Sequence, residues 1–232
     1  PVRFERGARR LAYNPDFILA GTHQGAEFLE LDIALLDQAI GLLSGNHGTQ
    51  RVTAVGFTVH ASTLQLRCSR KVYLDALASV PPELRRAAFA TIAEIETGTP
   101  LISITEWCAA LRSLLNRVGL DFHYTDLAIA GVGGTGAWAA GFHLPIHSGA
   151  QKGARAVRTL EQVRFWARTM HRQGMRLAVN GFHEAEFLSQ AIAAGVDLAT
   201  SDLMWPFDLV GAEPANDAPA PPAGGVRACG GT

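Results

Sequence analysis

The stretch RLAVNGFHEAEF, residues 176–187, is an apolar run that leads into two side chains able to do chemistry, Asn180 and His183. An acidic segment of helical composition follows. This pattern predicts a strand whose C-terminal end opens into a polar loop, and in α/β proteins that end of a strand usually carries the functional groups. An amide and an imidazole at this place either bind a ligand themselves or stand where other catalytic groups once stood.

The histidines and cysteines of the chain do not follow a known metal-binding pattern. The sequence has no HExxH motif and no CxxC pair among its three cysteines. A lone histidine at the end of a strand is more often hydrogen-bonded within the protein than a metal ligand. The odd number and wide spacing of the cysteines give no disulfide framework and suggest a reducing compartment, so we expect a cytoplasmic protein.

Residues 131–136, GVGGTG, match the G-x-G-x-x-G spacing of a dinucleotide-binding loop. Such a loop must open a helix, because the N-terminus of that helix holds the pyrophosphate. Here the chain reaches Pro145 before a helix could form, and no acidic residue ends a strand about 20 residues further on. We therefore expect a flexible loop at 131–136, which could close over a ligand or serve a partner surface.

Two further segments, HQGAEFLELDI (23–33) and GVDLATSD (195–202), are similar to glycerophosphodiester phosphodiesterases. In that family a His-Arg-Gly motif and a Glu-x-Asp motif, separated by a helix, supply metal ligands and acid/base groups. In this chain the two elements are fused with no helix between them, and the family's other histidine is not recognisable. This family stays a minor alternative.

Apolar periodicity divides the chain into alternating strand-like and helix-like segments. The strand-like segments are 52–60, 87–96, 120–131, 142–146, 175–180 and 196–205, and the helix-like segments are 29–44, 69–79, 104–117, 155–173 and 183–195. This alternation predicts an α/β fold with a parallel sheet and helical crossovers. The number of units favours a (β/α)8 barrel of the TIM type, with a doubly wound sheet as the alternative.

Composition limits the domain and its partners. We expect the barrel domain to occupy residues 1–212, because residues 213–232 are rich in Pro, Ala and Gly and predict a flexible tail. The formal net charge of −1 argues against nucleic acid as a partner. No apolar run approaches the roughly 20 residues needed to span a membrane.

Several segments, read in order, form a larger pattern. They are ERGAR (5–9), NPDFILAGTHQGAEFLELD (14–32), FTVHAST (57–63), VPPELRRAAFATIAEIETGTP (80–100) and RQGMRLAVNGFHEAEFLSQAIAAGVD (172–197). In order and approximate spacing they resemble the EAL domain, a barrel that hydrolyses the bacterial second messenger cyclic di-GMP (c-di-GMP). The resemblance covers roughly residues 3–210, and the family's first strand would lie before Pro1.

The resemblance implies a set of site residues. EAL chemistry is metal-assisted phosphodiester hydrolysis, in which carboxylates and an Asn hold two divalent cations. By position, the first carboxylate corresponds to Glu5 and the phosphate-facing arginine to Arg9. The metal-binding Asn becomes His60, the Glu of the Glu-Ile-Thr-Glu strand is retained as Glu94, and the family's pair of aspartates keeps one member, Asp126.

The sequence departs from the EAL pattern where hydrolysis needs it most. Pro145 stands where the family has its catalytic lysine, and Asn180 stands where it has a metal-site Glu. Thr97 and His183 replace two further glutamates. Losing about two negative charges matters, because two like-charged cations about 4 Å apart need that charge to offset their repulsion.

We therefore expect a catalytically degenerate EAL-like domain, with Glu5, Arg9, His60, Glu94, Asp126 and Asn180 around the ligand site and no metal cofactor. Such a domain would act as a c-di-GMP receptor or bind other domains of its own chain or a signalling protein. The alternative is an active phosphodiesterase that uses Mg²⁺ or Mn²⁺ at Glu5, His60, Glu94 and Asp126.

Overall fold

The computed structural model describes residues 4–6, 9–11, 25–46, 54–96, 98–122, 127–144 and 151–201. The proposed tail, residues 213–232, lies outside them, and so do Asp126 and Pro145. No helix within the described part is long and apolar enough to cross a membrane.

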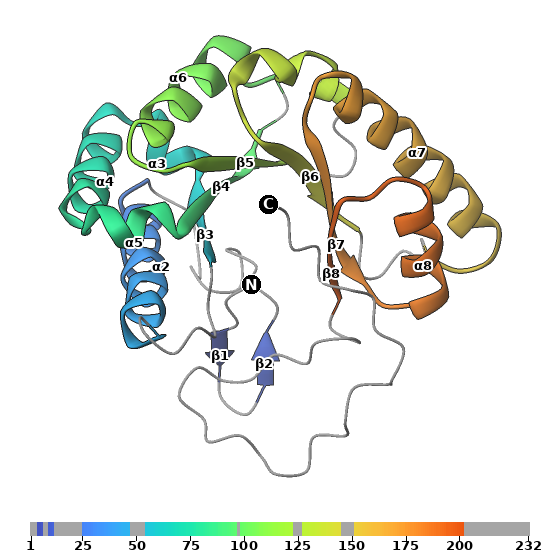
Figure 1. Ribbon diagram of the computed structural model, residues 1–232, viewed down its shortest axis with the longest axis horizontal. Coiled ribbons are helices and arrows are strands. Elements are labelled where there is room, and N and C mark those ends of the chain that lie inside the picture. The colour runs from blue at the N-terminus through green and yellow to red at the C-terminus, as the bar shows by residue number, and fades with distance from the viewer. Residues whose placement is uncertain are drawn as a thin grey trace.

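A curved parallel sheet is the centre of the fold (Figure 1). Its strands are β3 (Val55–His60), β4 (Ala88–Ile95), β5 (Arg117–Phe122), β6 (Ala139–His143), β7 (Arg176–Phe182) and β8 (Leu198–Ser201). They pair in sequence order, each parallel to the next. Apart from this sheet, β1 (Phe4–Arg6) and β2 (Arg9–Leu11) form an antiparallel pair.

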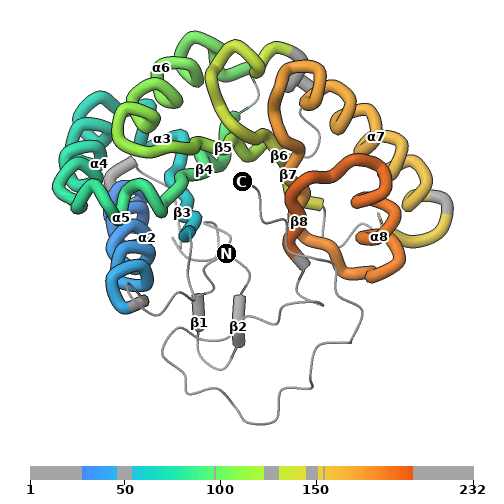
Figure 2. Tube along the Cα trace, viewed as in Figure 1, coloured from blue at the N-terminus to red at the C-terminus, as the bar shows by residue number. Residues whose placement is uncertain are grey.

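Helices connect the strands and cover the convex side of the sheet (Figures 1 and 2). They are α2 (Gly25–Asn46), α3 (Ala61–Gln65), α4 (Arg67–Ser79), α5 (Pro82–Arg86), α6 (Leu101–Arg112), α7 (Gly153–Arg172) and α8 (Ala185–Ala193). A doubly wound sheet would carry helices on both of its faces. The prediction of a barrel-type α/β fold is confirmed, as a half-barrel of six described parallel strands.

Alternation along the strands separates the core from the concave side. Val118 and Leu120 of β5, and Leu177 and Val179 of β7, are buried. In β6, the Phe142 ring packs against Trp166 of α7 with ring centres 5.4 Å apart, so this set of side chains faces the helices. The residues between them, and His143 after Phe142, face the concave side.

Two of the predicted segments end elsewhere in the structure. The helix expected over 104–117 stops at Arg112, and Arg117 already begins β5, because Val118 and Leu120 are needed as the buried face of that strand. The strand expected over 120–131 stops at Phe122. Its apolar second half belongs instead to a 3-10 helix, η1 (Leu127–Thr135).

The glycine-rich stretch 131–136 is not the flexible loop that we expected. It forms the end of η1, where the Gly133 amide donates to the Gln173 side chain and the Thr135 hydroxyl donates to the Val132 carbonyl. A Cβ atom on Gly133 would lie 2.7 Å from Gln173, so close packing explains this glycine. Because the stretch precedes β6, it lies at the amino ends of the strands and cannot close over a ligand at their carboxyl ends.

Candidate functional site

The carboxyl ends of six parallel strands meet at one edge of the sheet, here called the mouth. Barrel enzymes bind their substrates at this edge. The last residues of the strands bring one polar side chain each: His60, Glu94, Asp121, His143, Asn180 and Thr200. The mouth therefore has the composition of a binding site rather than of a packed core.

Four of these side chains form a row of polar contacts across β5, β6, β7 and β8. The His143 Nε2 atom lies 2.9 Å from Asp121 Oδ2, and the Asn180 amide nitrogen lies 3.5 Å from the same imidazole nitrogen. The Thr200 hydroxyl donates to Asn180 Oδ1 over 2.9 Å. This polar row gives each of its members at least one fixed neighbour.

The imidazole of His143 is biased towards its protonated form. Burial acts to lower its pKa, but the hydrogen bond and the negative charge of Asp121 outweigh burial, so the pKa is raised above its ordinary value. A cationic or donating imidazole at the mouth suits an anionic ligand better than a third carboxylate would.

Asp121, like His143 and Thr200, is a residue of this candidate site that the sequence did not predict. Its Oδ1 atom is buried and has no hydrogen-bond partner, and an orphaned carboxylate oxygen is costly unless a ligand donor or cation completes it. We assigned the β5 carboxylate to Asp126 instead. The position of Asp121 could have indicated its role. It is the polar residue near the end of the apolar run VGLDF, and it lies on the face of β5 that alternates with the buried Val118 and Leu120.

Glu94 reaches the mouth through a distortion of β4. The pairing of β4 with β5 shifts by one residue between Ile92 and Ile95, which marks a β-bulge. Glu94 lies within it and has a φ of 55°, in the left-handed region that a residue with a Cβ atom seldom adopts. Backbone strain of this kind is typical of functional sites, because packing alone gives no reason to keep it.

A second bulge ends β7 beside Asn180. The pairing of β7 with β8 shifts between Val179 and Phe182, and Gly181 has a φ of 85° there. The buried side chain of Gln151 fixes the following turn: its Oε1 accepts hydrogen bonds from the amides of His183 (2.8 Å) and Glu184 (3.2 Å), and its Nε2 donates to the Gly181 carbonyl. Hydrogen bonds of the Gln151 side chain therefore fix the conformation of the turn after Asn180.

His60 is more deeply buried than the sequence indicated. Its ring is fully buried, lies 4.5 Å from the Phe28 ring, and places Nδ1 2.5 Å from Asp32 Oδ1 of α2. The His60 backbone amide donates to Asp32 Oδ2 over 2.9 Å. Of the two ring nitrogens, Nδ1 is occupied by Asp32, so a role of His60 as a ligand depends on Nε2.

The Asp32–His60 pair holds one proton over a wide pH range. Burial raises the pKa of Asp32 to about 7, and the charge of Glu94 acts in the same direction. Burial lowers the pKa of His60 to about 4. Between these values Asp32 is protonated and His60 is neutral, so the carboxyl group donates to the imidazole.

Other predicted site residues cannot be joined to the polar row in the described part of the chain. Glu5 lies on β1 opposite Arg10 of β2, and Arg9 lies opposite Arg6, but their side chains fall outside the described residues. Asp126, Pro145 and Thr97 fall outside as well. Their roles stay predictions.

The described mouth residues partly fit a divalent cation. Asp121 Oδ1 and the Glu94 carboxylate are oxygen ligands of the kind that Mg²⁺ and Mn²⁺ prefer. Within the described ranges, however, no group of three or more His, Cys, Asp or Glu side chains is close enough to hold a metal ion. A complete metal site would need further ligands such as Glu5 or Asp126.

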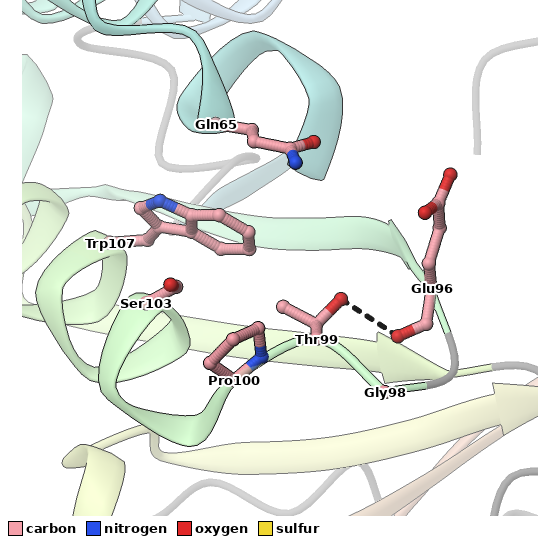
Figure 3. A pocket seen from close by; sticks show the side chains of 7 residues that line it. All are labelled: Gln65, Glu96, Gly98, Thr99, Pro100, Ser103 and Trp107. Carbon is pink, nitrogen blue, oxygen red and sulfur yellow. Dashed lines mark hydrogen bonds between the residues drawn. The ribbon is translucent and has the colours of Figure 1, made fainter.

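A small pocket of about 220 Å³ lies beside the mouth, where the chain leaves β4 (Figure 3). Its lining residues are Gln65, Glu96, Gly98, Thr99, Pro100, Ser103 and Trp107. The lining contains a carboxylate and no cationic side chain. It therefore does not suit the phosphate groups of a nucleotide.

Glycine and alanine substitutions at position 94 distinguish the cost of the strained backbone from the effect of losing the carboxylate. Both Glu94→Gly and Glu94→Ala remove the side chain, but only glycine adopts a φ of 55° without cost. We expect Glu94→Gly to be more stable than Glu94→Ala by about 1 kcal/mol in urea unfolding. Equal stabilities would show that Glu94 does not hold the strained conformation in solution.

Substitutions of Asp32 test the shared proton. Asn mimics a protonated carboxyl group, so the free energy of unfolding of Asp32→Asn should lie within about 1 kcal/mol of the wild-type value. Asp32→Ala removes the hydrogen bonds between Asp32 and the buried His60, and should lower the free energy of unfolding by about 2–3 kcal/mol.

The pH dependence of the free energy of unfolding gives a second test of this pair. Because the pKa of Asp32 is raised from 3.8 to about 7 in the folded protein, its contribution to stability is lost progressively as the pH rises from about 4 to 7, and it does not change further above pH 7. Asp32→Asn should lack this loss. A wild-type protein and an Asp32→Asn variant with the same slope of the free energy of unfolding between pH 4 and 7 would contradict the assignment.

Comparison with known proteins supports the fold and leaves the function open. No protein-family model and no curated protein sequence matches the chain. Among solved structures, the Xanthomonas citri FimX EAL domain in complex with c-di-GMP matches with a TM-score of 0.65 and 16% identity, over 87% of this chain and 78% of that one.

Two further EAL structures are similar. An EAL domain protein of Listeria monocytogenes matches with a TM-score of 0.59 and 15% identity, over 85% of this chain and 75% of that one. The Bacillus subtilis YkuI protein, in complex with c-di-GMP and calcium, matches with a TM-score of 0.57 and 16% identity, over 84% of this chain and 46% of that one. By its fold, the chain is an EAL-like α/β barrel.

Proposed function

We propose that this domain binds c-di-GMP at the mouth and acts as a signalling receptor without hydrolysing it. The observation that carries the proposal is the polar row of Asp121, His143, Asn180 and Thr200 at the mouth of an EAL-like barrel. FimX and YkuI, which share this fold, were solved in complex with c-di-GMP.

The chemistry of the row favours binding over hydrolysis. Metal-assisted cleavage of a phosphodiester needs several carboxylates around two cations. Here the row offers one carboxylate, and one oxygen of that carboxylate is engaged by His143. The imidazole of His143 and the side-chain amide of Asn180 can instead donate hydrogen bonds to phosphate oxygens.

Arg9 would supply the strongest contact in this proposal, since a guanidinium group grips a phosphate bidentately without a metal ion. The receptor would pass its signal to other domains of the same chain or to a separate signalling protein. We place it in the cytoplasm, as its cysteine content suggests.

One observation favours the alternative, an active phosphodiesterase with a changed metal site. Asp121 Oδ1 is buried without a partner, as a ligand awaiting a cation would be. Mg²⁺ or Mn²⁺ would then be held by Asp121 and Glu94 together with Glu5, His60 or Asp126, and would activate the attacking water.

Isothermal titration calorimetry of c-di-GMP, in Ca²⁺ and in EDTA, separates the two functions. A receptor should bind in both buffers with micromolar or tighter affinity. Arg9→Ala and Asn180→Ala should each weaken binding about tenfold, which corresponds to about 1.4 kcal/mol. Arg158→Ala, on the exposed surface of α7, is the control and should leave the affinity unchanged.

Binding that disappears in EDTA, with cleavage of c-di-GMP in Mn²⁺, would instead establish the phosphodiesterase. The absence of heat in both buffers would contradict both functions.

A further inference from the structure

The end of the barrel opposite the mouth carries a cluster of two arginines on one tryptophan. Arg117 begins β5, Arg176 begins β7 and Trp138 immediately precedes β6, so all three lie at the amino ends of parallel strands. The guanidinium carbon of Arg117 lies 4.7 Å from the centre of the Trp138 ring, and that of Arg176 lies 5.6 Å from it. Arg117, Trp138 and Arg176 are called the arginine–tryptophan cluster below.

A neighbouring aromatic ring holds Trp138 in place, while the two arginines of the cluster are exposed to solvent. The Phe89 ring, near the start of β4, meets Trp138 edge-on with centres 6.4 Å apart. Trp138 is half-buried, whereas Arg117 and Arg176 are both exposed. The aromatic base is therefore held in place, while the hydrogen-bonding edges of the two guanidinium groups can be reached.

The positive charge of the cluster is not neutralised within the described part of the chain. There, neither guanidinium group takes part in an ion pair or a hydrogen bond. Asp197, an acidic residue at the same end, is already engaged: its Oδ2 atom accepts hydrogen bonds from His171 and from the Leu177 amide, each over 2.8 Å.

Neighbouring residues add positive charge. A nitrogen of Arg112 lies against Gly136, two residues before Trp138, and Arg86 is joined through its carbonyl to Asn116, the residue before Arg117. Arg86 and Arg112 are exposed. Glu83, at the start of α5, is an exposed acidic group on this side.

Stacking on an aromatic ring does not by itself compensate two like charges. A cation–π contact at an exposed site is a weak interaction, and it leaves the N–H groups of a guanidinium unpaired. Planar guanidinium groups held over a ring are pre-oriented for carboxylates, which they bind bidentately.

We propose that the arginine–tryptophan cluster is a docking site for an acidic segment of a protein partner. Carboxylates fit better than a nucleic acid, because the whole chain has a formal net charge of −1, whereas proteins that bind a polyphosphate backbone usually carry a strong excess of positive charge. The site lies at the opposite end of the strands from the mouth, so a partner bound there leaves the mouth accessible. The proposal does not depend on c-di-GMP binding.

Fluorescence anisotropy with a labelled octaglutamate peptide tests the site in the complete chain. Wild-type protein should bind the peptide, with affinity falling between 50 and 300 mM NaCl. The double variant Arg117→Gln, Arg176→Gln should bind at least tenfold more weakly. The control Arg158→Gln, Arg164→Gln removes the same charge from exposed positions of α7 and should retain wild-type affinity.

Other outcomes overturn the proposal. Equal losses of affinity for the peptide in both double variants would show a non-specific charge effect. Absence of binding by the wild type would mean that the cluster has only a structural role. Tighter binding of a labelled dT8 oligonucleotide would favour nucleic acid, and binding to phosphatidylserine vesicles but not to the peptide would favour a membrane.

If the double variant unfolds at a lower temperature than its control, the single variant Arg176→Gln is compared with the wild type instead, and its affinity for the peptide should be at least threefold lower.

Discussion

The register of the parallel sheet is the constraint on which the rest of the structure depends. Each strand must place every second side chain under the helices, as Phe142 does against Trp166. The alternate residues then face the concave side, and the parallel pairing of β5, β6 and β7 brings Asp121, His143 and Asn180 to the same edge. The polar row is therefore a consequence of how the core is buried.

Deviations from regular geometry concentrate at the mouth. The bulges in β4 and β7 each add one residue to a strand just where it ends, and they carry Glu94 and Gly181 in left-handed conformations. The buried pair of Asp32 and His60 shares a proton next to the same edge. The opposite end of the strands is held by ordinary packing around Phe89 and Trp138, and there the arginines remain exposed.

Much of this fold could be predicted from the sequence, because apolar periodicity reports directly on burial. The run at 175–180 and the amphipathic pattern at 155–173 correspond to β7 and α7 within a few residues. The apolar stretch 120–131 was harder, since a strand and a 3-10 helix both bury small apolar residues and periodicity does not separate them. Pairing to β4 and β6 ends the strand at Phe122.

The site was only partly predictable, for a different reason. The position of Asn180 at the mouth could be predicted, because it lies near the end of a clear apolar strand. Asp121 and His143 were not recognised as site residues, because their relation depends on the register between β5 and β6, which the spacing along the chain does not reveal. Asp32 was missed because a carboxyl group in the middle of a helix looks solvent-exposed until a buried partner such as His60 is known.

The central claim, that the polar row is the ligand site, is tested most directly by NMR of the side-chain nitrogens during titration with c-di-GMP. His143 and Asn180 at the mouth should shift with the binding curve, while His171, paired with Asp197 at the opposite end, should not. Saturable binding that moves His171, or that leaves both His143 and Asn180 unchanged, would contradict the account.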